Sequence, residues 1–246
     1  MNKIYWILIV LFFACTKEEK NNTAVLPDIV TGKVIDIALD GSVPIDAISN
    51  KAGIPYNTIP ATNRHNEPNK AMLFNAADSA LVDFGDLEAA SFTNHQFTIS
   101  CWVYLTDTAK PCAILSKRSA FGGFEYSIDN HFKAKKYFSF DNWIESGTNT
   151  VYGIDPFNAS APVILNSWQH IAYVGTESQL QVYINGVLQN GTDQRQAFSF
   201  SNTDKHFVIG NGGGYGKNYF FNGAIDDIKI YNKVLDLSAI QVLAAQ

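Results

Sequence analysis

The chain has 246 residues and a formal net charge of −5 at pH 7, with 46% hydrophobic and 13% aromatic residues. This length is sufficient for one large β domain or two small ones. Mild acidity argues against a nucleic-acid partner and against adsorption to anionic lipid, because both need a basic face. Abundant Tyr, Phe and Gly, with only 2 Met, favour strands and turns over helix bundles.

The N-terminal segment has the layout of an export signal. Lys3 precedes an unbroken apolar run from Ile4 to Phe13, which is too short for a spanning helix of about 20 residues. The end of the segment resembles a bacterial lipobox, in which Cys15 carries diacylglycerol after cleavage, although Phe12 and Phe13 depart from the usual pattern. The alternatives are an ordinary signal cleaved nearby and an uncleaved anchor.

The polar stretch after Cys15 has no periodic apolar face and is predicted to be a flexible tether. Its Lys17-Glu18-Glu19 run resembles the surface-export signal of some Gram-negative lipoproteins; the alternative is a solvated linker that carries charge. We expect a signal peptide over 1–14, the lipidated cysteine and tether over 15–32, and one domain over 33–246. The protein would be a monomer on the outer membrane or cell surface, held to the membrane by the lipid on Cys15.

From about residue 33 onward the apolar pattern has a period of two. In the clearest run, 97–105, both faces carry bulky side chains, which predicts a central strand covered on both sides. Asn185-Gly186 lies between apolar runs and predicts a tight hairpin, because both residues accept positive φ. Further strands are predicted over 113–117, 124–128, 135–141, 168–174, 180–184, 207–209 and 224–231, and a short helix over 238–244.

Many short strands with Gly and Asn turns, and no helices between them, predict an all-β fold. The expected architecture is a two-sheet antiparallel sandwich or jelly roll. Two stretches, 44–68 and 147–162, contain prolines and are expected to be irregular. Neither shows the composition shift of a linker, so we predict a single domain.

The cysteine and histidine positions do not indicate a metal site and do not require a disulfide. Cys101 and Cys112 are an even pair, so a disulfide is permitted in an oxidising compartment. Cys101 also lies in an alternating apolar run and can equally be a small buried hydrophobe. The histidines are scattered singly, without the spacing of zinc ligands.

Four segments in order resemble one family. They are 69–82, 97–103, 168–172 with 182–186, and 209–210 with 221–235. Together they resemble the laminin-G-like jelly rolls of the concanavalin A-like lectin/glucanase superfamily, over residues 33–246. The resemblance implies two facing antiparallel sheets, one of them concave. It does not imply one activity, because this fold hosts lectins, adhesion modules, structural domains and glycosidases.

Adjacent acids stand on the final predicted strand. Alternation places Asp226 on the face of Ile228 and Ile230, and Asp227 on the face of Lys229 and Tyr231. One carboxylate is therefore expected to point inward. A buried carboxylate needs a cation or several hydrogen-bond donors.

In the family, the final strand and the loop corresponding to Asn75–Asp78 often lie together around calcium. The resemblance therefore implies a structural Ca²⁺ bound by Asp78, by Asp226 or Asp227, and by backbone carbonyls near Asn75 and Asn222. The chain departs from the family here, because Ala76, Asp78 and Ser79 stand where Gly and two acids are usual. The alternative is an aspartate that bonds to backbone amides and joins the two terminal segments.

The sequence gives no support for catalysis. Glycosidases of this superfamily use two carboxylates about 5–5.5 Å apart on one face of a strand. Glu125 and Asp129 share a face but stand four residues apart, which is too far, and no other glutamate has a suitable partner. Neither a nucleophile elbow nor a phosphate loop occurs. A glycosidase or lyase with an unrecognised set of residues is the alternative to a non-catalytic protein.

Aromatic residues in stretches expected to be irregular are the candidate ligand contacts: Trp143, Tyr152, Phe157, Tyr215 and Tyr219. Aromatic faces stack on the C–H surfaces of sugars, while Asn and Asp select hydroxyls. The alternative is that these side chains fix loops onto the sandwich. We therefore expect a non-catalytic, envelope-anchored binding module for carbohydrate or a surface protein, with a purely structural or adhesion domain as the competing interpretation.

Overall fold

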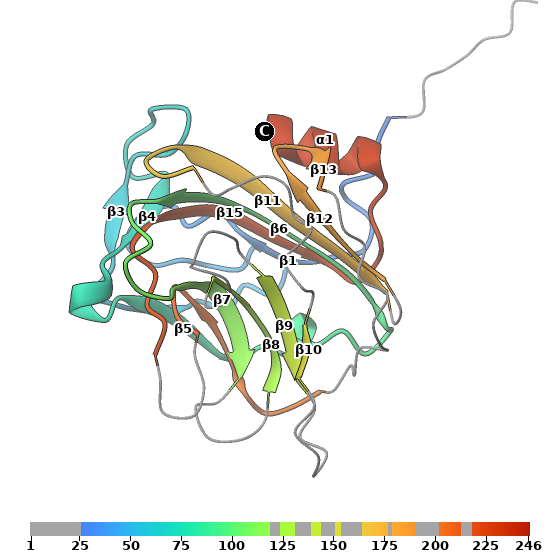
Figure 1. The fold of residues 1–246 in the computed structure, drawn as a ribbon, viewed down its shortest axis with the longest axis horizontal. Helices are drawn as coiled ribbons and strands as arrows, with labels where there is room; N and C mark the ends of the chain where they lie inside the picture. Colours follow the sequence, from blue (N-terminus) through green and yellow to red (C-terminus); the bar gives the residue numbers. More distant parts are fainter. Residues whose placement is uncertain are drawn as a thin grey trace, which may run out of the picture.

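The computed structural model describes residues 26–118, 124–130, 139–143, 151–153, 164–176, 179–189, 202–212 and 218–246. These residues form two antiparallel sheets that face each other across one hydrophobic core (Figure 1). The predicted all-β sandwich is therefore confirmed.

The larger sheet, here called sheet I, contains the longest strands. In spatial order it consists of β13 (Val187–Leu188), β12 (Leu180–Ile184), β11 (Trp168–Thr176), β6 (Gln96–Leu105), β15 (Gly223–Tyr231), β4 (Ala71–Phe74) and β3 (Ile59–Ala61), with β1 (Lys33–Ile37) also paired to β15. Every pairing is antiparallel.

The second sheet, sheet II, lies opposite. Its order is β10 (Val151–Gly153), β9 (Ser139–Trp143), β8 (Phe124–Asp129), β7 (Ala113–Arg118), β14 (His206–Ile209), β5 (Leu81–Asp86) and β2 (Ile54–Tyr56). Two short 3₁₀ turns, η1 (Ala76–Asp78) and η2 (Glu88–Ala90), flank β5. The helix α1 (Leu237–Ala245) follows β15.

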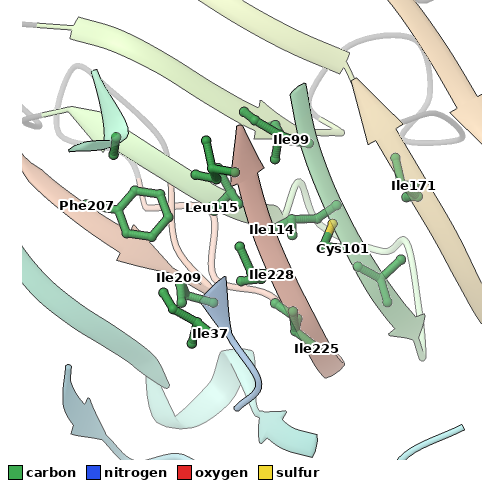
Figure 2. Close-up of a cluster of buried hydrophobic side chains, with 14 of the residues drawn as sticks. Ile37, Ile99, Cys101, Ile114, Leu115, Ile171, Phe207, Ile209, Ile225 and Ile228 are labelled. Carbon is green, nitrogen blue, oxygen red and sulfur yellow. The ribbon is translucent and has the colours of Figure 1, made fainter. Parts of the chain in front are cut away.

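Strand β6 shows why the sequence pattern works. Its core-facing residues, from Phe97 to Leu105 in steps of two, are at most 1% exposed. Figure 2 shows Ile99 and Cys101 of β6 pointing into a cluster that includes Leu115 and Ile209 of sheet II. The sandwich is thus closed by side chains from both sheets, as the alternation predicted.

The two internal cysteines do not form a disulfide. Cys101 and Cys112 are both buried and free. Burial raises the pKa of the Cys101 thiol to about 12, so this side chain is a packed, unreactive thiol.

The outer face of sheet I is covered on one side by α1. The Asp236 side chain caps the helix by accepting a hydrogen bond from the Ala239 backbone N–H at 2.8 Å. Ile240 and Leu243 are buried in an apolar cluster with Val174 of β11. In Figure 1, α1 lies at the end of sheet I away from β3 and β4. Nearer those strands, Arg64 of the loop between β3 and β4 lies on this outer face, bonded to Asp226 and Asp227. Across the described ranges, no helix is long and apolar enough to cross a membrane.

Two local predictions had different outcomes. Asn185 and Gly186 both have positive φ, 49° and 75°, as the hairpin required. By contrast, β2 and β3 lie inside 44–68, and β10 lies inside 147–162, both expected to be irregular. Pro55 and Pro60 are tolerated because β2 and β3 are edge strands.

Candidate binding site

A cavity of about 650 Å³ opens at the end of the sandwich where β4 and β6 end and β15 begins. It lies between loops of both sheets and combines amide, carboxylate, ammonium and aromatic groups. Its lining residues are Asn75, Ala76, Ala77, Asp107, Ala109, Lys110, Pro111, Cys112, Asn218, Tyr219, Phe220 and Asn222.

Asn222 ties the rim of this pocket together. Its Nδ2 donates to Asp107 Oδ2 at 2.6 Å, and its Oδ1 accepts from the Ala76 backbone N–H at 3.4 Å. Its backbone carbonyl accepts from both the N–H and the hydroxyl of Thr106, at 3.0 and 2.7 Å. One residue before β15 therefore fixes the loops that follow β4 and β6.

Asn75 orders the adjoining turn. Its Oδ1 accepts from the Ala77 N–H at 3.0 Å and so caps η1, while its Nδ2 donates to Asp78 Oδ2 at 2.6 Å. Ser79 then leaves the turn with a positive φ of 55°. The turn thus has a defined shape before any ligand arrives.

Tyr219 supplies an aromatic ring to the lining. Its backbone N–H donates to the Gly212 carbonyl at 3.1 Å, and its carbonyl accepts from Ala113 of β7 at 2.8 Å. Lys110 is exposed on the other loop. An aromatic surface among fixed polar groups is the usual chemistry of a small-molecule or sugar site.

Asp226 and Asp227 lie elsewhere, on the outer face of sheet I. Arg64 donates from Nη1 to Asp226 Oδ2 at 2.6 Å and from Nη2 to Asp227 Oδ2 at 2.7 Å. Lys229 Nζ lies 3.2 Å from Asp227 Oδ1. The cation that a buried carboxylate requires is therefore a side chain from a loop 162 residues away in the sequence.

The predicted face of Asp226 was wrong. Asp226 pairs with Trp102 and Lys229 pairs with Ser100, so three steps along β15 match two along β6. This bulge, with Asp227 at φ 50°, turns both acids to the side of Arg64. Strict alternation breaks at one inserted residue.

The two carboxyls differ in proton affinity. Burial, helped by the neighbouring Asp227, raises the pKa of Asp226 to about 7. Burial also acts to raise the pKa of Asp227, but Lys229 and Arg64 outweigh it and hold that pKa below its usual value.

The five residues predicted for calcium are divided between these places. Asp226 and Asp227 do not fit a calcium ion, because the guanidinium of Arg64 lies between them, bonded to one oxygen of each, and Lys229 lies beside the other oxygen of Asp227. Asp78 accepts the amide of Asn75, and Asn222 donates to Asp107. Within the described part of the chain, no three His, Cys, Asp or Glu side chains form a metal-binding group. Calcium at the rim residues stays a prediction.

The remaining candidates have mixed positions. Cys15, Phe157 and Tyr215 lie outside the described residues. Trp143 and Tyr152 belong to the paired strands β9 and β10 rather than to irregular loops, and their side chains are outside the described set. Of the five aromatic candidates, Tyr219 is the one that lines the pocket.

Sequence reasoning missed Asp107, Lys110 and Arg64. The first two directly follow the strand predicted over 97–105, and loops after strands are frequent binding positions. Arg64 lies in a stretch without periodic pattern, so its partners could not be read from local sequence.

The described lining of the pocket contains no pair of carboxylates. Among the described lining residues of the pocket, Asp107 carries the one carboxylate, and both its oxygens accept hydrogen bonds. Glu125 is buried, where its Oε1 accepts from the Thr203 N–H at 2.8 Å and lies 3.1 Å from Lys117 Nζ. Paired carboxylates at 5–5.5 Å are what retaining glycosidases need.

Comparison with known proteins identifies the fold family. The family model described as the concanavalin A-like lectin/glucanases superfamily, a laminin-G-like domain, matches residues 78–241. A search of curated proteins finds no match.

Solved structures share the fold at low sequence identity. Domain 4 of AbnA, a GH43 extracellular arabinanase from Geobacillus stearothermophilus, in complex with arabinotriose, has 18% identity and a TM-score of 0.63, covering 86% of this chain and 98% of that one. The binding domain of botulinum neurotoxin DC in complex with SialylT has 16% identity and a TM-score of 0.59, covering 87% and 51%. The same neurotoxin domain in complex with rat synaptotagmin II has 17% identity and a TM-score of 0.61, again covering 87% and 51%. This chain thus spans about half of the neurotoxin chains it matches.

Proposed function

Because the chain belongs to the concanavalin A-like lectin/glucanases superfamily, we propose that its jelly roll is a non-catalytic module that binds carbohydrate in the pocket at the Asn75–Asn222 rim. The observation that carries the proposal is the convergence of Asn75, Asp107, Tyr219 and Asn222 on one preformed cavity. Structural neighbours bound to arabinotriose and to SialylT support the ligand class.

The mechanism is recognition by a fixed rim. Hydrogen bonds already hold Asn222 against Asp107 and Ala76, so little conformational entropy is lost when a ligand binds. The ring of Tyr219 offers an apolar face to sugar C–H groups. The exposed ammonium of Lys110 and the second lone pairs of Asp107 bond to hydroxyls.

We also propose that a lipid on Cys15 anchors this module to the outer membrane or cell surface. The support is the sequence pattern ending at Ala14-Cys15 and the polar tether that follows. Metabolic labelling with a fatty acid in a Gram-negative host tests it: label on the wild type and none on Cys15→Ser is expected. Label that persists on Cys15→Ser contradicts it.

A glycan array followed by calorimetry tests carbohydrate binding. We expect saturable binding to at least one glycan class, weakened about tenfold or more in Tyr219→Ala. The matched control is Tyr56→Ala, an aromatic that is 48% exposed on β2 outside the pocket. Equal affinity of both variants, or no binding to any glycan, contradicts the proposal.

A protein partner is the second candidate. The botulinum neurotoxin DC binding domain, about half of which this chain matches, was solved in complex with rat synaptotagmin II, which supports a protein ligand. An array without a single glycan hit, together with a defined envelope protein that binds wild type and not Tyr219→Ala, would favour this candidate.

A further inference from the structure

One row of apolar side chains crosses the outer face of sheet I beside the pocket. Trp168 pairs with Tyr104, Tyr104 with Ala224, Ala224 with Leu73, and Leu73 with Ile59. We call these five residues the apolar row. It runs across β11, β6, β15, β4 and β3, or about 19 Å at the usual spacing between strands.

The row lies on the outer face of sheet I and not in the core, although its central residue, Ala224, is small and only 6% exposed. Leu73 is 37% exposed and Ile59 is 58% exposed, whereas Met72 and Phe74 on either side of Leu73 are fully buried. Tyr104 and Trp168 are partly exposed, and their rings meet edge to face with centroids 5.7 Å apart. The helix α1 lies over the other end of this sheet and does not cover β3 and β4 (Figure 1).

Polar groups border the row on both sides. On the side toward the pocket, Asn75 lies two residues after Leu73, just past the end of β4, and Asn222 lies two residues before Ala224, just ahead of β15. On the other side, Trp102 lies two residues before Tyr104 and Asp226 lies two residues after Ala224. Arg64 contacts both of them. At β15 the strip is therefore one side chain wide, with Asn222 and Asp226 on either side of Ala224 and the pocket next to it. At β6 the apolar surface continues into Trp102, whose ring lies against the Arg64 guanidinium.

This shape suits a sugar chain better than a protein. Protein interfaces have a broad apolar centre with a polar rim, which a single row does not provide. A sugar ring presents C–H groups on one face and hydroxyls around its edge, which matches aromatic and aliphatic surface flanked by amides and charges.

We propose that the apolar row binds a linear glycan chain that extends from the pocket across the outer face of sheet I. This inference rests on the carbohydrate-binding function proposed for the pocket. It adds a preference for polymers over short oligosaccharides, because units beyond the pocket gain contacts with Tyr104, Trp168 and Leu73.

Affinity electrophoresis in gels containing debranched arabinan, xylan, mannan, mixed-linkage β-glucan or polysialic acid tests it, alongside calorimetry with the matching trisaccharides. We expect at least one polymer to retard the full chain. Trp168→Ala and Leu73→Ser should each weaken polymer binding about five- to tenfold and leave trisaccharide affinity unchanged. Leu73 is exposed, so its replacement by Ser preserves the fold; thermal melting checks both variants. Tyr56→Ala is the control outside the row.

The outcomes separate the two proposals. Trisaccharide binding that is lost in Tyr219→Ala, with polymer binding no tighter and insensitive to Trp168→Ala and Leu73→Ser, overturns the row and leaves the pocket function standing. Polymer retardation lost in the row variants but unchanged in Tyr219→Ala overturns the pocket function, and with it the extension of a glycan from the pocket onto the row. If none of the polymers retards the chain, the proposal for the row is overturned, even if a protein is found to bind this face.

Discussion

The guanidinium carbon of Arg64 lies 4.6 Å from the centroid of the Trp102 ring while its two Nη atoms bond to Asp226 and Asp227. One side chain therefore bonds to two adjacent acids and stacks on an aromatic ring of the neighbouring strand. The Arg64 side chain is 9% exposed, so these interactions are weakly screened.

Arg64→Leu should destabilise the fold by about 3 kcal/mol, because Asp226 then has no cation beside it and Asp227 keeps only Lys229. Urea denaturation of the purified domain measures this. The matched control is Lys70→Leu, which removes a cation from an ion pair with Asp40 that is 49% and 43% exposed. That loss should be much smaller, because an exposed ion pair is screened by water and salt. Equal losses in the two variants would show that the Arg64 cluster is no stronger than a surface pair.

His170 should make folding sensitive to acid. Burial first, and then Lys229 and Arg64, lower the pKa of His170 to about 3, so the folded state keeps it neutral. In the unfolded chain His titrates near 6.5, so unfolding takes up a proton below that pH, and stability is lost as pH falls from 6.5 toward 3. The wild type should lose about 2 kcal/mol relative to His170→Gln between pH 6.5 and 5. If the difference in free energy of unfolding between wild type and His170→Gln does not change with pH, this prediction is contradicted. His206→Gln, at an exposed histidine, is the control.

Asp226 should act in the opposite direction. With a folded pKa of about 7, raised by burial, the carboxyl keeps its proton between pH 3.8 and 7, while the unfolded chain has lost it. Stability from this residue therefore falls as pH rises through that window. The free energy of unfolding of wild type minus that of Asp226→Asn should be smaller at pH 7 than at pH 4.5. The same urea titrations measure both values. The reverse slope would mean that Arg64 holds the pKa of Asp226 low.

Gly223→Ala should prevent close pairing of β15 with β6. A Cβ at Gly223 would lie 1.9 Å from the Tyr104 carbonyl oxygen, and the residue has a φ of 149°. We expect a loss of about 3 kcal/mol or more, together with a loosened pocket rim next to Asn222. Gly41→Ala is the comparison, because its φ is 71° but no atom lies within 4 Å of the added Cβ. It should cost about 1 kcal/mol, from backbone strain alone. Similar melting temperatures for the two variants would contradict the clash.

Local sequence was sufficient wherever alternation and turn chemistry decide the structure. The strand predicted over 97–105 is β6, and the Asn185-Gly186 turn has the required positive φ at both residues. The helix predicted over 238–244 is α1, one residue longer at each end. In these segments, burial against the partner sheet and intrinsic preference agree.

Sequence failed where long-range packing decides. Pro55 and Pro60 hid the edge strands β2 and β3, because an edge position removes the penalty for a missing N–H. The bulge at Asp227 put Asp226 on the opposite face from the one predicted, together with Asp227 and Lys229. Asn75, Asn222 and Tyr219 do meet in one pocket, but Asp226 and Asp227 bind Arg64, a partner distant in sequence that no spacing rule relates to them.

A buried thiol gives the molecule a native reporter. Because Cys101 and Cys112 are buried and unlinked, this core needs no oxidant to assemble, and reductants in a buffer do not weaken it. Cys112 lines the pocket, whereas alkylating reagents reach the Cys101 sulfur when the two layers separate. The rate at which Cys101 becomes labelled, followed by peptide mass spectrometry, therefore measures how often the sandwich opens.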